Sequence, residues 1–134
     1  MAFLTPARLL RLGAVLAGIG VALGAFGAHG LRSLVTPERL AVFETGVRYQ
    51  LVHALGILAA AGAAHVAPGA RAPRLAGRLF LVGVLLFSGS LYALVGTGVT
   101  AWGAVTPLGG LAFLAGWIAL ASTRLAQGRD DGSR

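Results

Sequence analysis

The sequence contains no cysteine and no lysine, and only four of its 134 residues are acidic. Without cysteine the chain forms no disulfide and has no thiolate nucleophile, cysteine-bound zinc or cysteine-held iron–sulfur cluster. Charged residues make up 11% of the chain, against about 25% in a typical soluble domain. This scarcity of charge excludes a disordered segment and argues against a soluble enzyme.

Apolar and small residues fill the chain instead. Hydrophobic residues account for 57% of it and 21 residues are glycine, with a mean hydropathy of +0.83. A soluble chain of this length would leave large apolar patches in water. The composition therefore predicts an all-α integral membrane protein, and the absence of any composition shift predicts a single domain over residues 1–134.

The spacing of the arginines divides the chain into membrane spans. The uncharged runs 12–31, 49–70 and 79–123 contain 20, 22 and 45 residues, and a spanning helix needs about 20. The third run is long enough for two spans, and its weakest point is the turn-forming stretch 96–100. These runs predict a four-helix bundle with spans at about 9–28, 45–66, 79–95 and 101–123.

The same arginines predict how the protein lies in the membrane. Eight of the 11 lie in the two tails and the second connection, whereas three lie in the first connection or beside it and none lies in the third. Because basic residues stay on the cytoplasmic side, we expect both termini to be cytoplasmic. Arginines at the borders of apolar runs fit lipid headgroups, so we predict no nucleic-acid partner.

The first span has a second interpretation as a cleaved secretory signal. Arg8 and Arg11 precede an apolar stretch that ends in small residues at 25–28. The stretch is longer than the usual 7 to 15 residues of a signal, and the later segments also span the membrane, which favours a retained span.

The first connection contains the signature of a helix start. Thr36 precedes Pro37 and Glu38, as an N-cap precedes a proline in the first turn. Apolar residues then follow at near-helical spacing. We therefore expect a short interfacial helix between the first two spans.

Small residues four apart recur along the spans, for example Gly20 and Gly24, Gly56 and Ala60, and Ala112 and Gly116. In a bilayer such residues let helices approach closely. Packing within one chain is the simpler interpretation. Besides the lipid bilayer, the sequence leaves two partners open: further copies of the same chain in a homo-oligomer, or another membrane protein.

Polar side chains at membrane depth gather on the non-cytoplasmic half of the predicted bundle. Tyr49, Gln50 and His53 share a helix face by their spacing, and the antiparallel spans bring the others to the same half. Such groups pair inside the protein. The predicted cluster comprises His29, Tyr49, Gln50, His53, Ser88, Ser90, Tyr92 and Thr106.

Two interpretations of this cluster are open. In the first, it is a hydrogen-bond network that fixes helix register in a structural or assembly protein. In the second, it is the site of a protein that handles a small solute, a proton or a lipid, with His53 as the titratable group. No acid lies within the spans and no catalytic arrangement is found, so we expect no enzyme, metal or cofactor.

Four segments, 24–30, 49–55, 86–92 and 106–117, together resemble the motifs of one family, in the same order: GAFGAHG, YQLVHAL, LFSGSLY and TPLGG running to Gly116 and Trp117. This family of small membrane proteins of unknown function includes bacterial YgdD-like proteins and human transmembrane protein 256. The resemblance covers about residues 12–123. It implies a four-span protein, in bacteria one of the inner membrane, and no established activity. All eight cluster residues fall on motif positions, whereas Arg48 does not.

Overall fold

The computed structural model describes residues 4–124, and every regular element among them is helical. The elements are α1 (Pro6–His29), η1 (Leu31–Ser33), α2 (Pro37–Val66), α3 (Ala72–Gly83), η2 (Val84–Ser88), α4 (Gly89–Thr97), η3 (Thr100–Ala104) and α5 (Thr106–Ala121). Four continuous helical stretches, Pro6–Ser33, Pro37–Val66, Ala72–Thr97 and Thr100–Ala121, are long and apolar enough to cross a membrane. This confirms the predicted all-α class with four spans.

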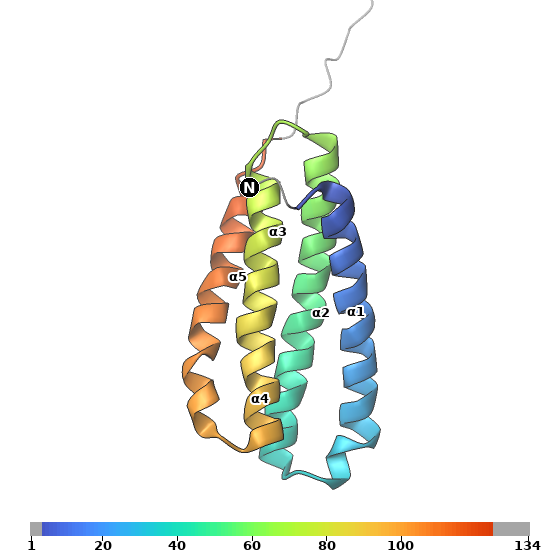
Figure 1. The fold of residues 1–134 in the computed structure, drawn as a ribbon, viewed down its shortest axis with the longest axis vertical. Coiled ribbons are helices and arrows are strands. Elements are labelled where there is room, and N and C mark those ends of the chain that lie inside the picture. Colours follow the sequence, from blue (N-terminus) through green and yellow to red (C-terminus); the bar gives the residue numbers. More distant parts are fainter. Residues whose placement is uncertain (1–3, 125–134) are drawn as a thin grey trace, which may run out of the picture.

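The four spans pack in chain order (Figure 1). α1 lies along α2, α2 lies against α3 and α4, and α5 lies along α3. α1 and α5 are therefore at opposite edges of the molecule. The described ends of the chain and the α2–α3 connection lie at one end, and the first and third connections lie at the other.

Helices α1 and α2 begin in the same way. The side chains of Thr5 and Thr36 each accept a hydrogen bond from the backbone three residues on, and a proline follows each cap. The cap at Thr36 was predicted, but the separate interfacial helix was wrong. The helix that begins at Pro37 continues without a break to Val66, because no proline lies between these residues to end it.

The third span is longer than predicted and contains an irregular turn. It begins at Ala72 rather than near residue 79, because arginines such as Arg74 and Arg78 favour a helix and do not end it. Residues Val84–Ser88 form a π-helical turn. The predicted turn near 96–100 is confirmed: α4 ends at Thr97 and is capped by Gly98, whose φ of 73° lies in the left-handed region.

Glycines set the contact between α1 and α2. Gly13, Gly20 and Gly27 are buried on α1, seven residues apart, as in a left-handed helix pair. A Cβ added to Gly20 would lie 2.7 Å from Leu51 Cδ2, and one added to Gly27 would lie 3.2 Å from the Phe43 ring. The two backbones thus approach more closely than alanines would permit.

Phenylalanines and glycines interlock between α3 and α5. Phe80 is fully buried against Gly116 and Gly56. Phe113 of α5 packs in turn on Gly83 of α3. Each ring fills the space that a missing side chain leaves, which gives this part of the core its dense packing.

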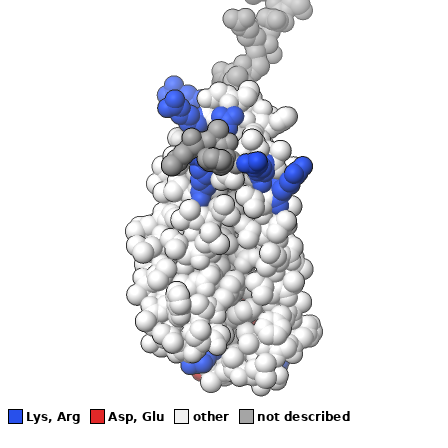
Figure 2. Space-filling model, in the orientation of Figure 1, with Lys and Arg blue, Asp and Glu red and all other residues white. Residues whose placement is uncertain are grey.

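The arginines lie mainly at one end of the molecule (Figure 2). No lysine occurs in the sequence, so the blue side chains near the described termini in Figure 2 are all arginine. The described arginines of this end are Arg8, Arg11, Arg71, Arg74, Arg78 and Arg124, whereas Arg32, Arg39 and Arg48 belong to the other end or to the span next to it. The asymmetry is the one that the sequence predicts.

Candidate functional site: an interhelical polar network and the groove beside it

Gln50 joins three helices. Its amide Nε2 donates a hydrogen bond of 2.9 Å to the carbonyl oxygen of Leu16 in α1, and its Oε1 accepts one of 2.9 Å from the Tyr92 hydroxyl in α4. The side chain is 3% exposed. The amide orientation follows from the partners, because the Leu16 carbonyl only accepts.

His53 uses both of its ring nitrogens. Nδ1 lies 2.7 Å from the carbonyl oxygen of Tyr49, and Nε2 lies 3.1 Å from the indole Nε1 of Trp117 in α5. A carbonyl only accepts and an indole N–H only donates, so Nδ1 carries the proton and Nε2 accepts. The arrangement therefore specifies the neutral imidazole with its proton on Nδ1.

Ser88 ties the π-helical turn to α2. Its hydroxyl is fully buried and donates a hydrogen bond of 2.7 Å to the carbonyl oxygen of Gly46. The wider turn of a π-helix changes the direction of side chains relative to a regular helix. Here Ser88 faces α2, and Phe87 faces α5, where it covers Gly109.

Ser90 and Thr106 join α4 to the start of α5. Their hydroxyl oxygens are 2.7 Å apart, and Ser90 also bonds to the carbonyl oxygen of Phe87 at 2.9 Å. Among the predicted cluster residues, the structure brings together all but His29. His29 is exposed at the end of α1, and no hydrogen bond or ring contact joins it to the other cluster residues.

An aromatic group that the sequence reasoning missed surrounds His53. The Phe113 ring stacks on the imidazole with centroids 3.4 Å apart and planes 7° apart, and the Trp117 ring lies 5.8 Å away. Trp117 and His53 are 64 residues apart in sequence, so no spacing rule relates them. The signal that could have drawn attention to Trp117 was its place inside a span rather than at the membrane surface.

A groove runs beside this network between α2 and α5. It has a volume of about 620 Å³, within the range of small-molecule sites. Its walls are mostly apolar, and Tyr49 and Trp117 are each 41% exposed. The lining residues are Tyr49, Val52, His53, Phe87, Pro107, Gly110, Leu111, Phe113, Leu114 and Trp117.

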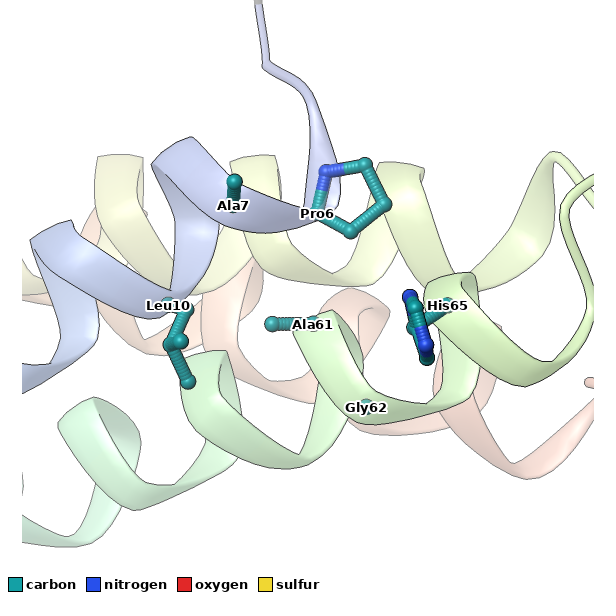
Figure 3. A pocket seen from close by; sticks show the side chains of 6 residues that line it. All are labelled: Pro6, Ala7, Leu10, Ala61, Gly62 and His65. Atoms are coloured by element: carbon teal, nitrogen blue, oxygen red, sulfur yellow. The ribbon is translucent and has the colours of Figure 1, made fainter.

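A second hollow of about 380 Å³ lies between α1 and α2 at the arginine-rich end (Figure 3). Pro6, Ala7 and Leu10 form one wall, and Ala61, Gly62 and His65 form the other. Its lining offers one polar side chain, His65, which is exposed at the end of α2. One imidazole without a second polar group offers little basis for binding a polar ligand or for catalysis.

Few of the described side chains within the spans could bind a metal ion or a polar ligand. Within residues 4–124, no three His, Asp or Glu residues come together in a group that could hold a metal ion. Only the hydroxyl of Thr123 is buried without a partner in this part of the chain. The buried polar groups of the network are thus hydrogen-bonded within the protein, as expected for polar groups in a membrane interior.

Fold and network together define a polytopic α-helical membrane protein whose spans are joined by internal hydrogen bonds. The comparisons then give its family: residues 23–110 match the model described as "Protein of unknown function (DUF423)", and the chain belongs to this family. No solved structure matches.

Relatives from several bacteria are similar over most of their length. The membrane protein YwdK of Bacillus subtilis (strain 168) is 48% identical over 107 residues, which cover 80% of this chain and 87% of YwdK. The inner membrane protein YgdD of Escherichia coli (strain K12) is 39% identical over 120 residues, which cover 85% of this chain and 86% of YgdD. The family resemblance seen in the sequence is confirmed, and these names carry no biochemical activity.

Proposed function

We propose that the protein is a non-enzymatic scaffold of the membrane, a structural or assembly protein whose polar network fixes the positions of its four helices. The observation that carries this proposal is the complete pairing of its buried polar residues. Gln50, His53, Ser88 and Ser90 are each 4% exposed or less, and each has a hydrogen-bond partner on another helix. Each of these side chains therefore already has a partner inside the protein, as expected of a network that fixes the positions of helices in a membrane.

The alternative of a proton or solute pathway through His53 receives less support. A second proton on Nε2 would point at the Trp117 N–H, two donors facing each other. Taking up that proton therefore requires Trp117 to move away. The same argument speaks against His53 as a metal ligand, since its one lone pair is already engaged.

Replacing His53 tests the scaffold role. His53→Ala removes two hydrogen bonds and the stacking with Phe113, and we expect it to lower the free energy of unfolding in detergent by about 1 to 3 kcal/mol. His65→Ala, at the exposed end of the same helix, is the matched control and should change it by less than about 0.5 kcal/mol. Wild-type stability of His53→Ala, or proton flux in vesicles of the wild-type protein that the variant loses, would contradict the proposal.

We also propose an orientation in the inner membrane with both termini in the cytoplasm, supported by the arginines gathered at the terminal end. The chain has no cysteine, so single cysteines report accessibility cleanly. A cysteine at Ser33 should react with an impermeant maleimide from outside the cell, and one at Ala72 should not. The reverse pattern would invert the orientation.

A further inference from the structure

Arg48 is an exposed charge inside a membrane span. Gly13 of α1 and Gly77 of α3 pack against Leu58 and Ala60 of α2, so Arg11 and Arg78 lie near one level of the molecule. Twenty residues of α2 cover about 30 Å, the thickness of the hydrocarbon layer. Counted from that level, the layer ends near residues 40–44, and Arg48 lies one to two turns inside it, about 6 to 12 Å.

This charge has no partner among residues 4–124. Glu44 is one turn away on α2, but no ion pair forms between them, and no described residue hydrogen-bonds to the Arg48 side chain. An unpaired arginine at this depth is costly. Its guanidinium can reach toward the membrane surface, where the strongest available partner is a lipid phosphate, which arginine binds through two parallel hydrogen bonds.

Arg48 lies beside the outer part of the groove between α2 and α5. It precedes Tyr49, a lining residue, and it lies one turn from Val52, another lining residue, on the same side of α2. The Tyr49 hydroxyl at this end of the groove also has no hydrogen-bond partner among residues 4–124. Two polar groups without partners among residues 4–124 thus lie beside the half of the groove that is nearer the membrane surface.

The length of the groove fits one acyl chain. Ser88 bonds to Gly46 and Phe87 covers Gly109, so Pro107 lies at about the level of residues 44–45 of α2, where the hydrocarbon layer ends. From Pro107 to Trp117 the groove follows α5 for ten residues, about 15 Å. That is the depth of one leaflet's hydrocarbon, half of about 30 Å.

We propose that this groove binds one phospholipid of the non-cytoplasmic leaflet, with its phosphate at Arg48 and one acyl chain along α5 toward Trp117. A second copy of the protein fits less well. Two-fold docking on this groove would bring another uncompensated arginine into the same apolar interface. The proposal goes beyond the scaffold role and does not depend on it, because Arg48 and Gly110 take no part in the polar network.

The test is native mass spectrometry of the delipidated wild-type protein titrated with dioleoyl phosphatidylglycerol. We expect one lipid bound per chain, and Arg48→Gln should weaken binding about tenfold or more, the loss of a charge-assisted hydrogen bond. Gly110→Trp should abolish binding, because Gly110 lines the groove and a side chain there meets open space. An excess of inorganic phosphate should leave the lipid bound, since the acyl chain contributes to affinity.

Two controls keep the test specific. Arg32→Gln removes an arginine of the same end outside the groove, and Gly18→Trp places the same large ring on the exposed side of α1, where nothing lies within 4 Å. Both should bind lipid as the wild type does, and the thermal midpoints of all variants are compared to establish folding. The proposal is overturned if folded Arg48→Gln and Gly110→Trp bind like the controls, if phosphate alone displaces the lipid, or if the wild type forms a lipid-free dimer that Gly110→Trp dissociates.

Discussion

The indole nitrogen of Trp117 donates a hydrogen bond to Nε2 of His53 across the contact between α5 and α2, at 3.1 Å. α5 otherwise packs mainly on α3. This bond therefore joins the edge helix directly to the helix that carries most of the network. It also decides which nitrogen of His53 holds the proton.

Removing the donor should loosen α5. Trp117→Phe keeps an aromatic ring beside Phe80 and leaves Nε2 without a partner, so we expect a loss of about 0.6 to 1.7 kcal/mol in the free energy of unfolding, the range for hydrogen bonds between membrane helices. Chemical denaturation in mixed micelles measures it. Trp102→Phe, in the exposed η3 segment, serves as the control. Equal stability of the two variants would mean that the bond contributes nothing.

The sequence predicted the spans well because their signal is local. Charge spacing located three apolar runs, and the turn-forming stretch 96–100, which contains Gly98, divided the third run into two spans. The prediction of a separate interfacial helix failed because a cap shows where a helix begins, whereas its end depends on a breaker such as proline, which residues 38–66 do not contain. The π-helical turn at Val84–Ser88 leaves no comparable local signal.

The polar residues of the candidate site could be predicted, but their pairing could not. Depth and spacing placed Gln50, His53 and Tyr92 together, since both can be counted along the chain. Which partner each finds depends on the rotation of neighbouring helices about their axes, which small residues such as Gly20 and Gly116 set through close contact. For this reason the predicted cluster did not include Trp117, and it included His29, which does not join it.

The pair Gln50 and Tyr92 should behave as one unit. Tyr92→Phe removes one hydrogen bond, and we expect it to cost about 0.6 kcal/mol. In a Gln50→Leu background the acceptor is already absent, so the same change should cost markedly less, and a double-mutant cycle of unfolding free energies measures the difference. Tyr49→Phe is the control, because the Tyr49 hydroxyl has no partner within the described residues. Additive effects would show that the two side chains do not interact.

Gly98 should resist replacement where its neighbour Gly96 does not. With a φ of 73°, Gly98→Ala forces an L-residue into the left-handed region, which costs about 1 to 2 kcal/mol. The added Cβ would also lie 3.3 Å from the Arg39 guanidinium. Gly96 is helical with open space around it, so Gly96→Ala should be neutral or stabilise by up to about 1 kcal/mol. Thermal unfolding of both variants measures these opposite changes in stability. If Gly96→Ala destabilised the protein and Gly98→Ala did not, the prediction would be contradicted.

The contact between α5 and the π-helical turn gives the sharpest comparison of adjacent residues. An alanine at Gly109 would overlap the backbone nitrogen of Phe87, and backbone cannot rotate away as a side chain can. We expect Gly109→Ala to destabilise the protein by about 1 to 3 kcal/mol, the cost of overpacking. Gly110→Ala meets nothing within 4 Å and should be neutral or slightly stabilising, since alanine favours the helix. Both are measured by thermal unfolding in the same detergent. If Gly109→Ala were as stable as Gly110→Ala, α5 could move away from Phe87 at no cost, and the tight packing of these two helices would not be needed to hold Trp117 against His53.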